Sequence, residues 1–156
     1  MDGADRGGWD PYAGTRRGRI LVVDDDAGQA WVLATLLEDE GLAATAMIDS
    51  VRAAELVPGM FDAVIIDLEM PNVDGLELLA RLRANDPTLP CVLVSGFSAD
   101  EPRIAAALQQ RGVMFVPKPI SVNDLIERLH QLLGHLRCRP FGRALRHHPM
   151  MAAAPS

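Results

Sequence analysis

The chain has 156 residues, 49% of them hydrophobic and 23% charged, and its 21 acidic and 15 basic residues give a net charge of −6. A chain of this length can bury a single core, and its acidic character argues against direct binding to DNA. We expect no membrane span, because no apolar run approaches the roughly 20 residues that one needs. The two cysteines, Cys91 and Cys138, lack metal-site spacing, and the N-terminus lacks the apolar core of a signal peptide. These features favour a cytoplasmic protein.

Short β-rich runs alternate with helical stretches after residue 18. The run 63–67 is apolar up to its last residue, as in strands that are covered on both faces. Asp26, Asp74, Ser98 and Ser121 each stand three positions before a Gln, Glu or Asp, which is the spacing of a helix-capping box. The predicted strands are 19–24, 42–48, 63–67, 91–95 and 113–116, and the predicted helices lie at about 27–40, 49–59, 74–86, 98–112 and 121–136.

The two ends of the chain are predicted to lie outside the fold. Residues 1–18 are polar, rich in glycine and without periodicity, which is typical of a flexible leader. Residues 138–156 contain three arginines, three prolines and no acidic residue, so we expect a basic, disordered tail. One folded domain, residues 19–137, is expected between them.

The alternation of strands and helices predicts β-α-β units, which form a parallel sheet with helices on both faces. Active residues of such sheets lie at the carboxyl ends of the strands. Asp24 ends the first predicted strand, Asp67 the third and Ser95 the fourth, and Lys118 follows the fifth. These four polar side chains are therefore expected to meet at one edge of the sheet.

Lys118 is the only lysine among the 15 basic residues. Lysine carries a compact charge on a flexible stem, so it can reach into a crowded anionic pocket where the planar arginine fork fits poorly. The segment 24–26, which is Asp-Asp-Asp, and Asp67 supply candidate anions. Carboxylates about 4 Å apart repel by roughly 4 kcal/mol per pair at an effective dielectric constant of 20, and therefore need a cation. Carboxylates and water are ligands that suit Mg²⁺.

Four segments together resemble the receiver domain of a bacterial two-component response regulator, over about residues 19–137. They are Val22-Val23-Asp24-Asp25, the run 66–75 (Ile-Asp-Leu-Glu-Met-Pro-Asn-Val-Asp-Gly), Val94-Ser95-Gly96 and Lys118-Pro119, and they occur in the order of that family. The resemblance implies an α/β fold of the flavodoxin-like (βα)5 type, with strand order 2-1-3-4-5. No output domain follows in this sequence, so we expect either a stand-alone receiver or a piece of a larger protein.

The resemblance also implies a metal site and a phosphoacceptor. Asp25, Asp67 and the backbone carbonyl of Glu69 would contact Mg²⁺, and Asp24 would act through water. Asp67 would accept a phosphoryl group from a phosphohistidine of a sensor histidine kinase or a phosphotransfer protein. Lys118 and Mg²⁺ would neutralise the phosphoryl oxygens. The domain would thus catalyse only its own phosphorylation and dephosphorylation, and would act on an unknown downstream protein.

A conformational switch follows from the same resemblance. The Ser95 hydroxyl would hydrogen-bond the phosphoryl group and move toward it, and Phe115 would fill the space that Ser95 leaves. A plain core role for Phe115 is an equally open alternative. A homodimer through the fourth helix, the fifth strand and the fifth helix is a further possibility. Glu69 and Phe97 occupy positions that in this family tune the lifetime of the phosphoryl group.

Two other functions remain open on the residues alone. A haloacid-dehalogenase-type phosphatase would use Asp24 and Asp26 as its Asp-x-Asp pair, but it would leave Asp67 without a role. A degenerate receiver would serve only as an interaction module. Asp26 is better explained as a helix cap than as a metal ligand. Trp31 is expected to pack in the core, with a place on a kinase-docking surface as the alternative.

Overall fold

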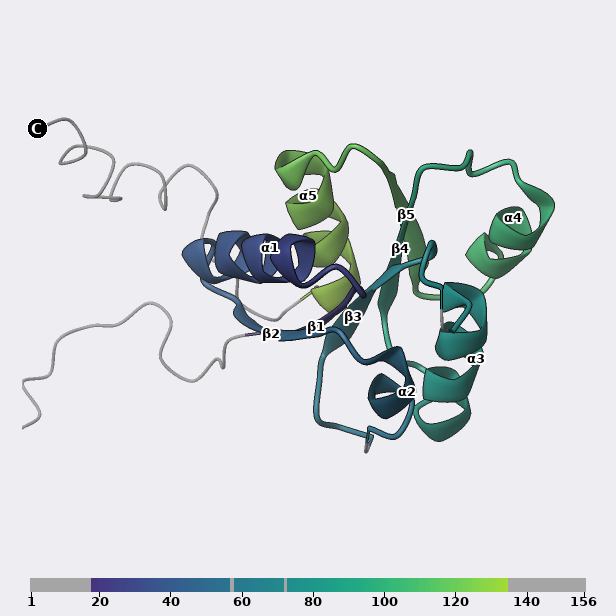
Figure 1. Cartoon of the computed structure of the whole chain (residues 1–156), viewed down its shortest axis with the longest axis horizontal. Coiled ribbons are helices and arrows are strands. Elements are labelled where there is room, and N and C mark those ends of the chain that lie inside the picture. The colour runs from purple at the N-terminus through teal and green to yellow at the C-terminus, as the bar shows by residue number, and fades with distance from the viewer. Residues whose placement is uncertain (1–17, 57, 72, 135–156) are drawn as a thin grey trace, which may run out of the picture.

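The computed structural model describes residues 18–56, 58–71 and 73–134. The predicted tail 138–156 lies outside this range, as does the predicted leader except for Gly18, which is buried and accepts a hydrogen bond from the Ala43 amide at 2.8 Å. Five strands alternate with five helices in the described part (Figure 1). The strands are β1 Arg19–Val23, β2 Ala43–Met47, β3 Ala63–Asp67, β4 Cys91–Ser95 and β5 Val113–Pro117, and the helices are α1 Ala27–Asp39, α2 Ser50–Ala53, α3 Gly75–Asn85, α4 Pro102–Leu108 and α5 Val122–Leu133.

The strands form one parallel sheet in the order β2-β1-β3-β4-β5, which confirms the predicted fold. The register is in step across the sheet: Val23 pairs with Ile66, Asp67 with Val94, and Ser95 with Pro117. The carboxyl ends of β1, β3, β4 and β5 therefore lie at one edge. Pro117 is the last residue of β5, an edge strand, where the N–H that proline lacks costs no hydrogen bond to a further strand.

Helices cover both faces of the sheet: α1 and α5 lie on one face, and α2, α3 and α4 on the other (Figure 1). Side chains alternate between the faces along each strand, so Ile20 and Val22 pack under α1 and α5, and Leu21 and Val23 pack under α2 and α3. Every residue of β3 and β4 is buried, which is why these two strands read as continuous apolar runs. No helix in the described ranges is long and apolar enough to span a membrane.

Three of the predicted helix caps are confirmed and one is wrong. Asp26, Asp74 and Ser121 each accept a hydrogen bond from a backbone amide of the first helical turn. Ser98 does not cap α4, which begins at Pro102 after Glu101. The residue before a proline is disfavoured in the helical conformation, and proline is preferred at the first helical position, so the cap is Glu101, three residues after the predicted Ser98.

Trp31 is 66% exposed, so the prediction that it packs in the core is wrong. Helix α1 buries Ala30, Ala34 and Leu37, which are spaced four and three residues apart and so lie on one stripe. Trp31 comes one position after Ala30 and is therefore turned about 100° away from that stripe. The second predicted helix, about 49–59, is too long, because α2 is only Ser50–Ala53. Helix α4 ends at Leu108, four residues before its predicted end, and β1 ends at Val23, one residue before. The predicted helix end at residue 136 lies outside the described residues.

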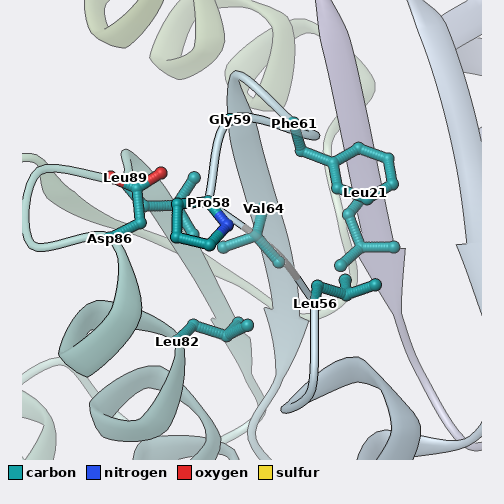
Figure 2. A pocket seen from close by; sticks show the side chains of 9 residues that line it. All are labelled: Leu21, Leu56, Pro58, Gly59, Phe61, Val64, Leu82, Asp86 and Leu89. Atoms are coloured by element: carbon teal, nitrogen blue, oxygen red, sulfur yellow. The ribbon is translucent and has the colours of Figure 1, made fainter.

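A small cavity lies between β1, β3, α3 and the segment that connects α2 to β3 (Figure 2). Its volume is about 20 Å³, which is room for roughly one water molecule. Apolar side chains form most of its wall, and Asp86 is the charged residue among those that line it. A space of this size is a packing gap, so we place no binding site there. The lining residues are Leu21, Leu56, Pro58, Gly59, Phe61, Val64, Leu82, Asp86 and Leu89.

Candidate functional site

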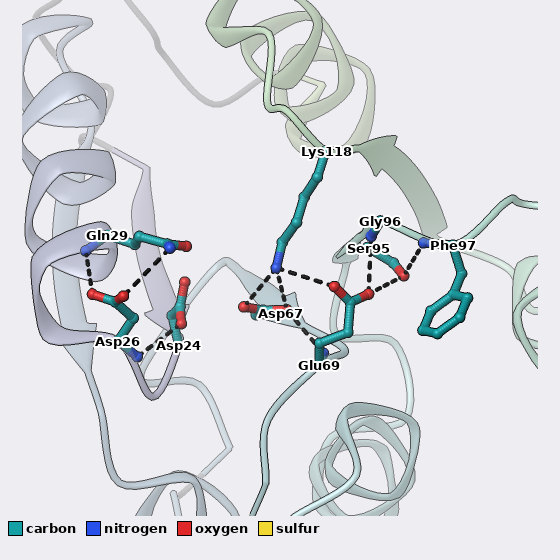
Figure 3. Close-up of polar contacts among 9 residues, drawn as sticks. All are labelled: Asp24, Asp26, Gln29, Asp67, Glu69, Ser95, Gly96, Phe97 and Lys118. Atoms are coloured by element: carbon teal, nitrogen blue, oxygen red, sulfur yellow. Dashed lines mark hydrogen bonds and ion pairs between the residues drawn. The ribbon is translucent and has the colours of Figure 1, made fainter.

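The carboxyl edge of the sheet brings together the polar residues that follow its strands (Figure 3). Asp67 is the last residue of β3 and only 6% exposed, so its carboxylate lies at the floor of the site. Lys118 follows β5, where its backbone amide donates to the Ser95 carbonyl at 2.9 Å and so extends the pairing of β4 with β5. The Lys118 Nζ atom lies 3.1 Å from both carboxylate oxygens of Asp67.

The carboxylates around Lys118 stabilise the positive charge of its ammonium. Burial alone would lower the pKa of Lys118, but hydrogen bonds and charge from Asp67, with a smaller contribution from Glu69, raise that pKa above its ordinary value. Lys118 is therefore a fixed cation on Asp67. The peptide bond between Lys118 and Pro119 is cis.

Asp24 and Asp25 stand beside Asp67 at the end of β1. The three side chains can each present one carboxylate oxygen such that these oxygens all lie within 4.8 Å of one another. Burial, together with the charge of Asp67, raises the pKa of Asp24 to about 6, although a hydrogen bond from the Asp26 amide lowers it. Asp25 is exposed, so the cluster opens to solvent. Clustered carboxylates with access to water fit the ligand preference of Mg²⁺, a hard cation that retains several of its waters.

The sequence predicted the position of Glu69 at the site, but not the contacts that its side chain makes. Its Oε2 atom accepts hydrogen bonds from the Ser95 hydroxyl and from the Gly96 amide, the latter at 2.9 Å, and its Oε1 atom lies 3.3 Å from Lys118 Nζ (Figure 3). Burial alone would raise the pKa of Glu69, but the Ser95, Gly96 and Lys118 contacts hold it below its usual range. One sequence pattern could have indicated these contacts: Glu69 comes two residues after the strand-end Asp67, and a Ser-Gly pair stands at the end of the neighbouring strand β4.

Ser95 and Phe115 occupy different environments. Ser95 is fully buried at the end of β4, and its hydroxyl donates to Glu69 and accepts from the Phe97 amide at 2.9 Å. Phe115 is half-buried and packs against the core under α3 and α4. These contacts agree with a core role for Phe115, and its movement in a switch stays a prediction. Phe97 is 62% exposed beside the site.

Asp26, which the phosphatase alternative needs as its second acid, points away from this cluster. Its carboxylate accepts from the Gln29 amide at 3.0 Å and so caps α1 (Figure 3). The predicted capping role of Asp26 is confirmed. A second catalytic acid after Asp24, as the phosphatase requires, is therefore not supplied by Asp26.

Comparison with known proteins agrees with this geometry. The response regulator receiver domain family matches residues 20–130. The chain is 30% identical over 121 residues to the DNA-binding transcriptional regulator NtrC of Escherichia coli, covering 77% of this chain and 26% of NtrC. It is 35% identical over 112 residues to the transcriptional regulatory protein FixJ of Bradyrhizobium diazoefficiens, covering 71% of this chain and 54% of FixJ. The chain thus spans about a quarter to a half of the length of these relatives.

Solved receiver domains have the same fold. The receiver domain of the Francisella response regulator 1452 matches with a TM-score of 0.66 at 30% identity, over 75% of this chain and 97% of that one. The receiver domain of the hybrid histidine kinase CckA matches with a TM-score of 0.60 at 34% identity, over 74% of this chain and 99% of that one. The chain belongs to the response regulator receiver domain family, and it carries a receiver domain of a two-component system.

Proposed function

We propose that Asp67 is the phosphoacceptor of this receiver domain and that its phosphorylation changes contacts with other proteins. One observation carries the proposal: the Lys118 ammonium lies 3.1 Å from both oxygens of the buried Asp67 carboxylate. A structural ion pair could use either basic residue type, but this chain places its single lysine here. Asp24 and Asp25 can each present a carboxylate oxygen within 4.8 Å of one from Asp67, and these acids would hold a cation beside the phosphoryl group.

The chemistry requires alignment and charge neutralisation. An Asp67 oxygen would attack the phosphorus of a phosphohistidine, a P–O bond would form, and the P–N bond would break with its electron pair returning to the imidazole. The product is an acyl phosphate on Asp67 and a free histidine on the donor. Because the transferred group carries its charge on the equatorial oxygens, the Lys118 ammonium would stabilise it, and the Ser95 hydroxyl would donate to one oxygen.

Mg²⁺ is the cation that this pocket would hold. Asp24, Asp25 and Asp67 offer the carboxylates, and the family resemblance adds the backbone carbonyl of Glu69. A bound Mg²⁺ would supply positive charge to the phosphoryl oxygens. Asp25 is exposed and Asp67 is buried, so the cation site would lie at the mouth of the pocket. Loss of Mg²⁺ is therefore expected to abolish labelling of Asp67.

The partners follow from the proposed chemistry. A sensor histidine kinase or a phosphotransfer protein would donate the phosphoryl group. A further protein would bind the surface that the proposed movements of Ser95 and Phe115 alter. The domain, residues 19–137, would catalyse only its own phosphorylation and dephosphorylation and would not itself bind DNA. Homodimerisation through α4, β5 and α5 and a cytoplasmic location stay predictions.

Incubation with acetyl phosphate and Mg²⁺, followed by intact mass measurement, tests the proposal. Wild type is expected to gain one phosphoryl group, and Asp67→Asn is expected to gain none. Asp39→Asn is a matched control, because Asp39 is an exposed aspartate at the end of α1 that lies far from the site. An equal mass gain in wild type and in Asp67→Asn would refute the assignment of the acceptor.

A further inference from the structure

The Glu69 carboxylate is surrounded by donors from two other segments of the chain. The Ser95 hydroxyl and the Gly96 amide come from the end of β4, and the Lys118 ammonium comes from the segment after β5. The Glu69 side chain is 32% exposed, so these contacts are partly shielded from water. A hydroxyl, a backbone amide and an ammonium that converge on one anion form an oxyanion site, and charge-assisted bonds of this kind are stronger than neutral ones.

The donors that hold Glu69 are the donors that a phosphoryl group on Asp67 would need. Lys118 Nζ contacts Asp67 and Glu69 at the same time, at 3.1 Å and 3.3 Å (Figure 3). The Ser95 hydroxyl has one proton to donate, and it donates that proton to Glu69. A phosphoryl oxygen can therefore gain the Ser95 bond only after Glu69 releases it. Two anions in one small site would also repel each other.

We propose that the Glu69 carboxylate is an internal competitor for the phosphoryl site: it occupies the donors of Ser95, Gly96 and Lys118 in the resting domain and must leave before a phosphoryl group binds. This inference rests on the proposed function of Asp67. When a ligand binds only the open fraction of a protein, its apparent affinity falls by that fraction. The Glu69 contacts thus set how readily the domain accepts a phosphoryl group.

The alternative explanation is that the Glu69 contacts only stabilise the fold by connecting the ends of β3 and β4. Glu69→Gln separates the two explanations, because glutamine keeps the size and one acceptor oxygen of the side chain but loses the charge that competes with a phosphoryl group. Glu69→Ala removes the side chain altogether. Glu77→Gln is the matched control, since Glu77 is an exposed glutamate of α3 that pairs with Arg81 at 2.9 Å.

The experiment titrates the full chain with beryllofluoride and Mg²⁺ and follows the Gly96 amide by nuclear magnetic resonance. Before titration, the Gly96 amide proton is expected to move upfield in Glu69→Ala, because it loses its carboxylate acceptor. Beryllofluoride is then expected to bind Glu69→Gln and Glu69→Ala with a Kd about tenfold or more below that of wild type. A ratio of this size is expected if the site is open in about a tenth of the wild-type molecules. Glu77→Gln is expected to bind as wild type does.

The outcomes distinguish the two proposals. Equal affinity in wild type and both Glu69 variants would overturn the competitor and leave Asp67 as the acceptor. An unchanged Gly96 amide in Glu69→Ala would likewise overturn it, because the contact would be absent in solution. If no protein of the series binds beryllofluoride, the phosphoacceptor proposal itself fails and the competitor fails with it.

Discussion

The single lysine of this chain lies on the buried Asp67, and the shape of its side chain matters as much as its charge. Lys118 contacts two carboxylates, Asp67 and Glu69, with one nitrogen atom. A guanidinium keeps the charge but presents a planar fork that is wider than an ammonium. Arginine at this position is therefore expected to bind the carboxylates without leaving room for a phosphoryl group.

Lys118→Arg is expected to slow the labelling of Asp67 by acetyl phosphate about 10²-fold or more, the usual cost of losing one well-placed donor to a developing charge. The rate of mass gain in the presence of Mg²⁺ measures this effect. Arg81→Lys, an exchange of cation type on the exposed face of α3, is the control and should leave the rate unchanged. A wild-type rate in Lys118→Arg would show that charge alone suffices.

Glu40 follows the end of α1 that is opposite to the site, and its negative charge is expected to destabilise the folded state because the residue is buried. Its side chain is 4% exposed, and its Oε2 atom has no hydrogen-bond partner among the residues that the structure describes. Burial raises the pKa of Glu40, and the charge of Asp39 raises it further. A raised pKa in the folded state means that folding favours the protonated form, so stability from this group is present at low pH and is lost as pH rises through the raised pKa.

Glu40→Gln, which resembles the protonated form, is therefore expected to raise the Tm at pH 7. The advantage over wild type should shrink as pH falls toward about 4, near the ordinary pKa of a glutamate. Thermal unfolding of both proteins across this pH range gives the comparison, with the exposed Glu127→Gln of α5 as control. A Tm difference that does not vary with pH would contradict this explanation.

At the scale of the element, the helices owe their start points to single residues. Ser121 accepts a hydrogen bond from the Asp124 amide at 3.2 Å and so caps α5, whereas Ser98 accepts from the Asp100 amide at 3.1 Å in a turn before α4. Removing a cap typically costs about 1 kcal/mol, because an amide of the first turn loses its partner.

Ser121→Ala is accordingly expected to lower the free energy of unfolding by about 1 kcal/mol, and Ser98→Ala by roughly 0.5 kcal/mol or less. Urea unfolding of the two variants measures both values under the same conditions. A larger loss in Ser98→Ala than in Ser121→Ala would contradict the helix boundaries described above.

These caps also show what local sequence can predict. The strands were predicted closely, since the buried runs of β3 and β4 are apolar up to their last residues, Asp67 and Ser95. The start of α4 was not, because the capping-box pattern at Ser98 competes with the restriction that Pro102 imposes on Glu101. The exposure of Trp31 was also missed, since any large apolar residue in a helix suggests burial until the buried stripe of that helix is known.

At the scale of the whole molecule, the in-step parallel sheet places residues from distant parts of the chain at one edge. Strand-end position was enough to predict that Asp24, Asp67 and Lys118 would meet, because parallel strands share a carboxyl edge. The contacts of Glu69 could not be predicted in this way. They depend on the direction of a side chain in a loop and on donors 26 to 49 positions away along the sequence.

The central claim is that a phosphoryl group is attached to Asp67. Borohydride reduces an acyl phosphate of aspartate to homoserine, with phosphate as the leaving group, and so marks the modified residue permanently. After treatment with acetyl phosphate and Mg²⁺, peptide mass spectrometry is expected to find homoserine in place of Asp67 and intact aspartate at positions 24 and 25. Homoserine at Asp24 or Asp25, or at no aspartate of the chain, would contradict the account.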